Sequence, residues 1–426
     1  YVIERLIDSV CEINYPKDKL EIQVLDDSTD ETTAIVAKAV EAKQKLGFDI
    51  VHIRRGSREG FKAGALKEGM KIAKGEFIAI FDADFIPQKE FLMKTLAHFT
   101  DEKVGMVQTR WEHLNGDYSI ITKAQALALD GHFVIEQTVR NKSGFFINFN
   151  GTGGVWRKKC IEDAGNWHAD TLTEDLDLSY RAQLIGWRFV FLKDFTSPAE
   201  LPSEINALKA QQFRWTKGAV ETAKKILPLV WKSKVPMRVK LQSTFHLTNN
   251  LVFPFILLAA ILNVPLIFIK NSGAHEVYFA IMSLFVLAFV SSFLFYMYSQ
   301  KDIRTDWRKR IVLFPLFMAG SMGLAVNNSR AVFEGLMNRK SEFVRTPKFK
   351  QESGKDTFVG NKYLNKKLGL SVFVEAVLAV YCFIGVLSSI YFMELASIPF
   401  QVLFTLGFSF IAYTSIKHAY AVKKIQ

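Results

Sequence analysis

Residues 21–84 open with EIQVLDDS and close with EFIAIFDAD, and short apolar runs alternate between them with longer stretches of helical periodicity. Runs rich in Ile, Val and Phe predict strands, whereas apolar residues three and four apart predict helices. The predicted strands are residues 21–25, 49–53 and 76–81, and the predicted helices are residues 31–45 and 63–73. This order is typical of an α/β domain with a Rossmann-like, mostly parallel, doubly wound sheet.

Acidic residues follow two of the predicted strands. Asp26 and Asp27 end the first strand, and Asp82 and Asp84 end the third. In open α/β sheets ligands bind beyond the carboxyl ends of the strands, and a D-x-D pair can hold a divalent cation that screens a diphosphate. Either cluster alone is more often a solvated turn, but both at one sheet edge favour a nucleotide diphosphate site. Nearby cations that could meet phosphate at the start of the second helix are Arg54, Arg55, Arg58 and Lys62.

A third acidic element opens the stretch ADTLTEDLDLSYRAQLIGWR, residues 169–188. Thr173 is expected to cap a helix there, and the helix dipole is expected to keep Glu174 and Asp175 ionised at neutral pH. The apolar face of this helix comprises Leu176, Tyr180, Leu184 and Ile185. An ionised carboxylate suits a general base, although a lone pair of first-turn acids is more often structural.

The composition changes along the 426 residues, from a charged first half to long apolar runs in the second. Four runs are of membrane-spanning length: residues 245–269, 277–299, 371–393 and 398–416. The net charge of +12 resides largely in short loops beside these runs, which indicates membrane topology rather than nucleic-acid binding. We therefore predict an integral, multi-pass protein of the lipid bilayer, at the plasma or inner membrane if the source is bacterial, with no nucleic acid partner.

A fifth apolar run, residues 311–326, is shorter and contains Pro315. Both of its flanks are basic, so the positive-inside rule places both on the cytosolic side and predicts an interfacial or re-entrant segment. The expected organisation is a cytosolic catalytic domain at 1–203, interfacial helices at 204–244 and a membrane domain at 245–426. Within the membrane domain we expect an interfacial helix at 311–335 and a basic loop at 339–367.

Residues 2–13 are predicted to form a helix that ends before Pro16. No strand precedes it, although a sheet of this type would normally begin with one. We expect the first strand of the domain, and a further membrane helix, to precede residue 1. Nothing in the sequence indicates an oligomeric state.

Three motifs together resemble one known family. They are FNGTGGVWR at 149–157, TED at 173–175 and QQFRW at 211–215, and the last matches the pattern Q-x-x-R-W. The chain resembles the processive family 2 glycosyltransferases of the GT-A fold, especially cellulose synthase-like mannan and xyloglucan-backbone synthases, and more distantly cellulose and hyaluronan synthases. The resemblance covers nearly the whole chain, apart from the first strand and the N-terminal membrane helix.

The resemblance implies a role for each matching residue. The implied catalytic residues are Asp175 as the base, Glu174 and Arg214. The implied donor-nucleotide residues are Asp26, Asp27, Lys62, Asp82, Gln211 and Arg214, with Asp82 and Asp84 holding Mg²⁺ or Mn²⁺. The implied acceptor residues are Trp215, Asn150, Gly151 and Thr152. These roles are chemically reasonable, because inverting transfer needs a base for the acceptor hydroxyl and positive charge for the leaving diphosphate.

Residues 343–348, FVRTPK, resemble the F-x-V-T-x-K gating loop of cellulose synthase with the spacing displaced by one residue. The residues that would form the loop are Phe343, Val344, Arg345, Thr346 and Lys348. An ordinary basic loop beside the membrane has the same composition. The displaced spacing leaves the role of Thr346 open.

The resemblance implies processive transfer of hexose from a nucleotide diphosphate sugar, UDP-glucose or GDP-mannose, to a β-linked polysaccharide acceptor that the membrane helices then translocate. Two alternatives remain open. One is a single transfer of sugar to a lipid carrier, which would not require Q-x-x-R-W. The other is a catalytically silent membrane protein that binds or transports glycans.

Overall fold

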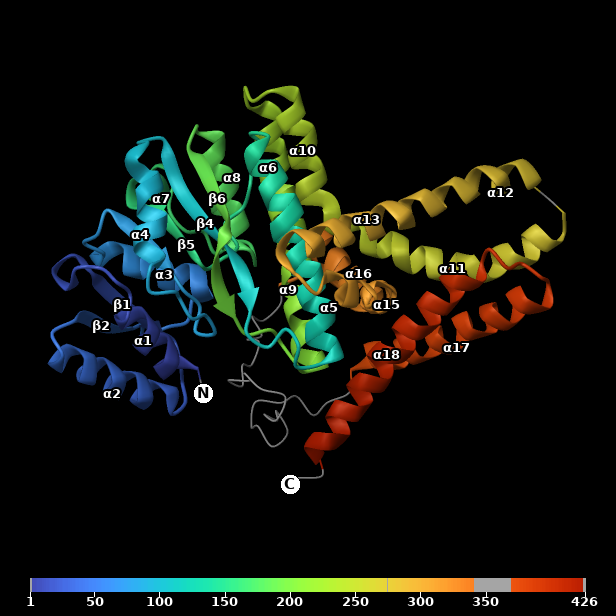
Figure 1. Cartoon of the computed structure of the whole chain (residues 1–426), viewed down its shortest axis with the longest axis horizontal. Coiled ribbons are helices and arrows are strands. Elements are labelled where there is room, and N and C mark those ends of the chain that lie inside the picture. Colours follow the sequence, from blue (N-terminus) through green and yellow to red (C-terminus); the bar gives the residue numbers. More distant parts are fainter. Residues whose placement is uncertain (1, 274, 341–368, 424–426) are drawn as a thin grey trace.

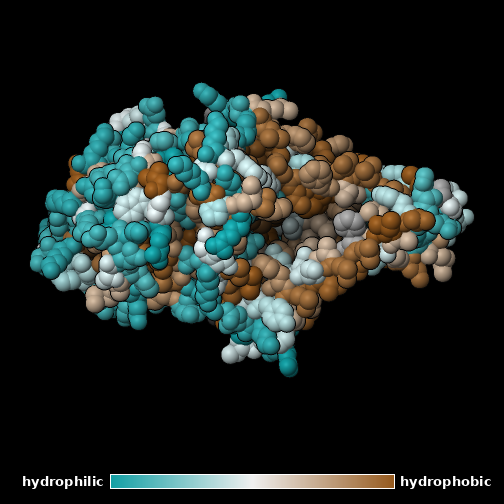
Figure 2. All heavy atoms as spheres, turned by 90° about the horizontal axis from the view of Figure 1, so that it is seen from above, coloured by the Kyte–Doolittle hydropathy of each residue, from teal (hydrophilic) through white to brown (hydrophobic). Residues whose placement is uncertain are grey.

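The computed structural model describes residues 2–273, 275–340 and 369–423. An α/β part forms one end of the molecule, and long helices extend away from it at the other end (Figure 1). The surface changes in the same direction, because hydrophilic residues cover the α/β part and hydrophobic residues gather over the extended helices (Figure 2). This division agrees with the change in composition along the sequence.

The α/β part contains every strand found among the described residues. Its elements are α1 (Ile3–Cys11), β1 (Glu21–Asp26), α2 (Thr32–Lys45), β2 (Asp49–Arg54), α3 (Phe61–Ile72), β3 (Phe77–Ile80), α4 (Phe91–Leu96), β4 (Val104–His113), α5 (Ile120–Asp130), the π-helix η3 (Gly131–Gln137), α6 (Thr138–Lys142), β5 (Gly154–Arg157), α7 (Lys158–Asp163), α8 (Glu174–Leu184) and β6 (Arg188–Ala199). The strands and helices predicted between residues 21 and 81 are present, with bounds shifted by a few residues at most.

The strands form two sheets. Strands β1 and β2 pair in parallel, and the larger sheet has the order β3-β5-β4-β6. Strand β5 runs antiparallel to both of its neighbours, whereas β4 and β6 are parallel. The predicted α/β class is confirmed, but the sheet is mixed rather than mostly parallel. The reason is that β5, part of the FNGTGGVWR segment, folds back between β3 and β4. The composition of so short a strand does not determine its direction.

Trp156 anchors the core of the larger sheet. Its side chain is fully buried, and its ring contacts Phe149, Trp167 and Phe189 at centroid separations of 5.6, 6.0 and 5.2 Å. Such edge-to-face aromatic contacts add to the free energy gained by burying the rings. The tryptophan of the VWR sequence therefore fixes the loop before β5 and the segment that leads to α8.

The helical part begins with α9, the longest α-helix in the described part of the chain. Its elements are α9 (Ile205–Lys232), α10 (Met237–Thr248), η4 (Asn249–Leu251), α11 (Val252–Asn271), α12 (Glu276–Met282), η5 (Ser283–Phe285), α13 (Val286–Ile303), α14 (Trp307–Ile311), α15 (Phe314–Gly323), α16 (Ala325–Leu336), α17 (Leu370–Tyr391) and α18 (Ile398–Lys423). Four helical stretches are long and apolar enough to cross a membrane: Met237–Asn271, Glu276–Ile303, Leu370–Tyr391 and Ile398–Tyr420. They correspond to the four predicted spans, although the span predicted at 371–393 extends two residues beyond the end of its helix.

The fifth apolar run is divided among the short helices α14, α15 and α16, none of which is among the four candidate spans. Helix α15 packs closely against α18. A Cβ atom at Gly323 would lie 2.3 Å from the carbonyl oxygen of Gly407, and one at Gly407 would lie 2.2 Å from that of Ala319. The two backbones therefore approach each other without an intervening side chain, as small residues allow.

Helix α9 packs against α8. The apolar residues that join them are Leu176, Tyr180, Ala219, Ala223, Ile226 and Val230. A Cβ atom at Gly218 would lie 2.9 Å from the backbone nitrogen of Thr173, so only glycine allows this approach. Much of α9 is thus internal, and the surface-lying character predicted for it is confined to exposed residues such as Leu229 and Trp231 near its end. The packing fixes the TED segment relative to QQFRW.

A buried ion pair joins α9 to a candidate membrane span. Lys209 Nζ lies 2.7 and 3.0 Å from the two carboxylate oxygens of Glu375 in α17, and both side chains are almost fully buried. The carbonyl oxygen of Lys209 also accepts a hydrogen bond of 3.0 Å from Asn327 of α16. Lys209 precedes Gln211 by two residues, so the Q-x-x-R-W helix is held directly by α16 and by the candidate span α17.

Candidate active site

The acids at the end of β1 are paired with basic residues of β2 and the loop that follows it. Asp26 accepts the Ser28 N–H at 2.8 Å and lies 3.0 Å from His52 Nε2. Burial opposes its charged form, but the hydrogen bonds from Ser28 and His52 outweigh burial and lower the pKa of Asp26. Asp27 pairs with Arg55, whose Nε lies 3.0 Å from the Asp27 carboxylate. This edge therefore presents partly neutralised carboxylates.

The acids after β3 lie beside Lys62 at the start of α3. The Lys62 ammonium pairs with the Asp82 carboxylate and donates a hydrogen bond of 2.8 Å to the Gly151 carbonyl. The backbone N–H of Asp82 donates to Thr152 Oγ1 at 2.9 Å. The Asp82 side chain stays 41% exposed, and Asp84 is half-buried two residues later. Lys62 thus connects the D-x-D element to the loop before β5.

The first turn of α8 lies against that same loop. The Ser179 hydroxyl donates to the Asp175 carbonyl at 2.6 Å and accepts the Phe149 N–H at 2.9 Å. A Cβ atom at Gly151 would lie 3.0 Å from Asp175 Oδ2, and Gly151 has a φ of +82° that favours glycine. The Asn-Gly-Thr loop and the TED segment therefore meet, so Gly151 and Thr152 form a wall of the site.

Thr173 does not cap α8 as predicted. It occupies the N-cap position, but its side chain accepts no hydrogen bond from the first turn and instead lies 3.0 Å from the Thr222 hydroxyl of α9. The prediction rested on local preference, and the contact with α9 overrides that preference. Thr173 consequently helps to align α8 with the Q-x-x-R-W helix.

The prediction that the helix dipole keeps the TED carboxylates ionised at neutral pH does not hold for Asp175. Burial, followed by repulsion from Glu174, raises the pKa of Asp175 to about 7. Burial likewise raises the pKa of Glu174, although Lys62 opposes this shift. Burial favours the neutral amine of Lys62, but attraction to Asp82, Glu174 and Asp175 outweighs burial and raises its pKa. Desolvation therefore outweighs the helix dipole here.

Arg214 brings the Q-x-x-R-W helix into the same cluster. Burial lowers the pKa of its guanidinium, against the attraction of Asp82, Glu174, Asp175 and Asp84 in that order. These acids come from the end of β3 and the start of α8, so the arginine lies among residues far apart in sequence. Gln211 and Trp215 are half-buried on the same helix. The structure thus brings together Lys62, Asp82, Asp84, Glu174, Asp175 and Arg214, six residues predicted from sequence.

Asn150 is held by residues that the sequence did not single out. Its N–H donates to Gln108 Oε1 at 2.9 Å, and its side chain accepts from Gln137 Nε2 at 2.8 Å and lies 3.2 Å from His132 Nε2. His132 in turn lies 2.9 Å from Glu136. His132, Glu136 and Gln137 belong to the π-helix η3, and π-helical turns occur frequently at functional sites.

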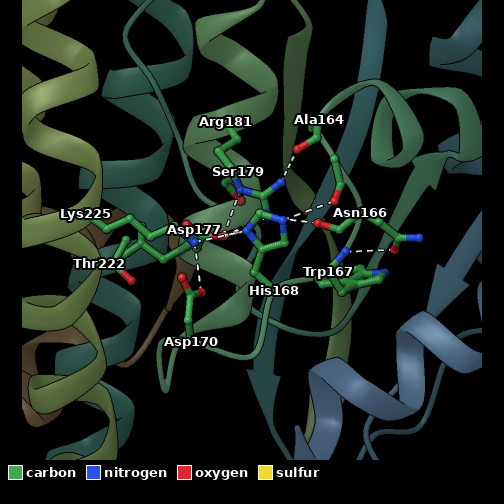
Figure 3. A network of polar contacts seen from close by, with 12 residues as sticks. Ala164, Asn166, Trp167, His168, Asp170, Asp177, Ser179, Arg181, Thr222 and Lys225 are labelled. Atoms are coloured by element: carbon green, nitrogen blue, oxygen red, sulfur yellow. Dashed lines mark hydrogen bonds and ion pairs between the residues drawn. The ribbon is translucent and has the colours of Figure 1, made fainter.

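A network behind α8 offers a possible cation site of a different kind. Asp177 is fully buried and pairs with Arg181 at 2.7 Å and Lys225 at 2.9 Å, while Lys225 also contacts Asp170 at 2.8 Å and His168 at 3.1 Å (Figure 3). The ligand atoms of His168, Asp170 and Asp177 lie within 4.8 Å of one another. Because a lysine and an arginine already neutralise them, we interpret this network as a brace between α8 and α9.

Residues 343–348, predicted to form the gating loop, lie outside the described residues. The first strand and membrane helix expected before residue 1 also remain predictions.

The sheet and the helices that cover it define a GT-A glycosyltransferase fold. Among solved structures, the chain is similar to the mannosyltransferase PcManGT from Pyrobaculum calidifontis, in complex with GDP-Man and Mn²⁺, with a TM-score of 0.53 and 19% identity. The likeness covers 80% of this chain and 84% of that one. At this identity the comparison shows the fold alone.

The chain belongs to the family described as "Glycosyltransferase like family 2", which it matches over residues 1–218. It is 40% identical over 252 residues to "Probable glucomannan 4-beta-mannosyltransferase 11" of Oryza sativa subsp. japonica, covering 58% of this chain and 44% of that protein. It is 35% identical over 360 residues to "Probable glucomannan 4-beta-mannosyltransferase 10" of Arabidopsis thaliana, covering 82% and 63% respectively. The chain therefore spans less than two thirds of the length of either relative. The resemblance to cellulose synthase-like mannan synthases is confirmed.

Proposed function

We propose that the protein is a membrane-embedded, processive, inverting hexosyltransferase. It would transfer hexose from a nucleotide diphosphate sugar to a growing β-linked polysaccharide, with a β-1,4 linkage, and translocate the product through its membrane helices. The observation that carries the proposal is the meeting of Asp175, Lys62, Asp82 and Arg214 in one cluster. The names of the rice and Arabidopsis relatives support a mannose- or glucose-containing product.

The cluster suggests a division of labour. Asp175, with a pKa of about 7, suits a general base that removes the proton of the acceptor hydroxyl at neutral pH. Lys62 and Arg214 supply positive charge where the diphosphate leaves. Asn150, Gly151 and Thr152 shape the wall of the site, and Trp215 offers an apolar platform of the kind that suits a sugar ring.

The oxygen atoms of Asp82 and Asp84 fit a hard divalent cation. Mg²⁺ and Mn²⁺ prefer carboxylate oxygens, and the Asp82 side chain is accessible. Such an ion supplies positive charge that neutralises the diphosphate. Asp26 and Asp27 would lie toward the nucleoside, and Gln211 beside the pyrophosphate.

The raised pKa of Asp175 predicts the pH dependence of turnover. Below pH 7 the carboxyl group is increasingly protonated and cannot accept a proton, so kcat/KM should fall about tenfold for each unit below the pKa. Above pH 7 the rate should level off. Measuring nucleotide release from pH 5 to 9 tests this, and a flat profile between pH 5 and 7 would contradict the role of Asp175.

Basic flanks on both sides predict that residues 311–326 do not cross the bilayer, and that residues 343–348 lie on the cytosolic side over the donor pocket. A straight helix of 16 residues would reach only about 24 Å, short of the ~30 Å hydrocarbon core. Single cysteines at Thr305 and Ser341, in a background lacking the native cysteines, should react with an impermeant thiol reagent only after the cytosolic face is opened. Ser272→Cys, in the opposite loop, is the matched control and should react from outside. Labelling of Ser341→Cys from outside intact cells would refute this topology.

Product analysis tests the proposed function itself. Purified protein supplied with radiolabelled UDP-glucose or GDP-mannose should form long chains that endo-glycosidases degrade. A solvent-extractable labelled product would instead show single transfer to a lipid carrier. No release of nucleotide from a panel of sugar donors would indicate a catalytically silent protein.

A further inference from the structure

A second cavity lies away from the catalytic cluster, between η3–α6 and α10. Its volume is about 560 Å³, within the usual range for small-molecule sites. One wall comes from η3, α6 and the turn after α6, and the other from successive turns of α10 and the start of η4. The lining residues are Ile135, Glu136, Val139, Arg140, Phe145, Leu241, Gln242, Phe245, His246 and Asn249. Figure 1 shows α6 and α10 side by side.

Two residues that line this cavity each have a buried polar atom without a hydrogen-bond partner among the described residues. Arg140 uses Nη2 to bind Glu136 at 3.0 Å, but its buried Nη1 has no hydrogen-bond partner among the described residues. The same holds for Oε1 of Gln242 on the opposite wall. Leaving a buried polar group without a partner is costly, so a ligand with polar groups near these residues would be stabilised. The free guanidinium nitrogen suits an anionic oxygen.

Most of the exposed lining of the cavity is apolar, and the cavity is open to the surface. Phe245 is 76% exposed, and Val139 and Leu241 are about half exposed. Beyond the cavity, Met237 and Trp231 extend this exposed apolar surface along α10 and the end of α9. Trp231 donates through Nε1 to Thr244 at 3.1 Å, the amphipathic arrangement common at membrane interfaces.

The cavity is also continuous with a candidate membrane span. Helix α10 forms the first part of the stretch Met237–Asn271, and α11 follows it through η4. Arg238, at the start of α10, lies over the Phe145 ring at 5.9 Å, which adds a second cation at the cavity edge. Arg140 and Arg238 exceed the single acid Glu136, so the local charge is positive. A positive polar end beside an apolar, membrane-adjacent surface complements a phospholipid.

We propose that this cavity binds one membrane phospholipid with an anionic headgroup. The phosphate lies beside the guanidinium groups of Arg140 and Arg238, the headgroup faces Gln242, and an acyl chain covers Leu241 and Phe245. A glycan fits less well, because the cavity offers two unpaired polar atoms against a mostly apolar lining. The bound lipid would contact η3 and help to hold it in place, and His132 of η3 contacts Asn150 of the proposed active site.

Native mass spectrometry of the full chain tests this proposal. After delipidation in detergent, the protein is titrated with diacyl phosphatidylglycerol, and one tightly bound lipid is expected. Arg140→Gln should weaken binding about tenfold or more, as expected for loss of a charge-assisted hydrogen bond. Val139→Trp fills the cavity without removing charge and should also abolish the tight site. Arg188→Gln, an exposed arginine paired with Asp101 away from the cavity, is the matched control and should bind like the wild type.

Competition identifies the ligand class. Glycerophosphoglycerol, which carries the headgroup without acyl chains, should displace the lipid only at far higher concentration. Equal competition would overturn the proposal in favour of a soluble phosphate ligand, and displacement by a manno-oligosaccharide would identify a glycan site. Unchanged lipid binding in both Arg140→Gln and Val139→Trp would also overturn it. Because Val139→Trp retains the arginine, a folding defect in Arg140→Gln would still leave a decisive comparison.

Discussion

Asp175→Asn is expected to lower sugar transfer by about 10² to 10⁴-fold, the usual effect of losing a general base. Asparagine is nearly isosteric with aspartate but cannot accept the acceptor proton. Nucleotide binding should persist, because Lys62, Asp82 and Arg214 are unchanged. Transfer is measured as labelled polymer, and donor binding is measured separately by calorimetry. Near-normal turnover would remove Asp175 from the mechanism.

The same variant should be at least as stable as the wild type. The pKa of Asp175 in the folded protein, about 7, lies above its value of about 3.8 in the unfolded chain, so its stabilising contribution is present below pH 3.8 and lost as the pH rises through 7. Asparagine carries no charge and avoids that loss at neutral pH. A melting temperature equal to or above that of the wild type would show that the loss of sugar transfer is not caused by unfolding of the variant. Asp163→Asn, an exposed acid that pairs with Lys159 on α7, is the control and should stay active.

Removal of divalent cations should abolish transfer, and Asp84→Ala should weaken donor binding on the order of 10²-fold. The reason is that a metal contributes several kcal/mol to charge stabilisation, and each 1.36 kcal/mol corresponds to tenfold. Activity after chelation should return with Mn²⁺ or Mg²⁺ in the wild type and much less in Asp84→Ala. Asp101→Ala, an acid on an exposed turn, should behave like the wild type. Full activity in chelated protein would require the D-x-D assignment to be withdrawn.

The sequence predicted the elements that rest on local pattern. Strands β1, β2 and β3 follow from β-branched and aromatic runs, and the four candidate spans follow from length and hydropathy. The acidic motifs could be placed at one edge because strand ends in an α/β sheet face a common side. The same rule predicts one site for Asp26, Asp27, Asp82 and Asp84. Strands β1 and β3 lie in different sheets, however, and a site shared by all four acids stays a prediction.

What the sequence could not predict depends on tertiary contacts. The ionisation of Asp175 depends on burial and on Glu174 beside Lys62, and the Thr173 hydroxyl turns to α9 instead of capping α8. Ser179 fixes the Asn-Gly-Thr loop through one hydrogen bond to Phe149, and serine in a helix gives no signal of such a role. The antiparallel direction of β5 is likewise set by its neighbours and not by its own residues.

The buried pair of Lys209 and Glu375 bears on how the protein is assembled during synthesis. Carboxylates enter a membrane-spanning helix at considerable cost, and removing one partner of a buried pair leaves an uncompensated charge. Helix α17 emerges from the ribosome long after α9, so its stable insertion awaits an already folded Q-x-x-R-W helix that presents Lys209. A chain in which α9 fails to fold would leave the Glu375 carboxylate of this candidate span without its partner. The folding of α9 and the stable placement of α17 are thereby coupled.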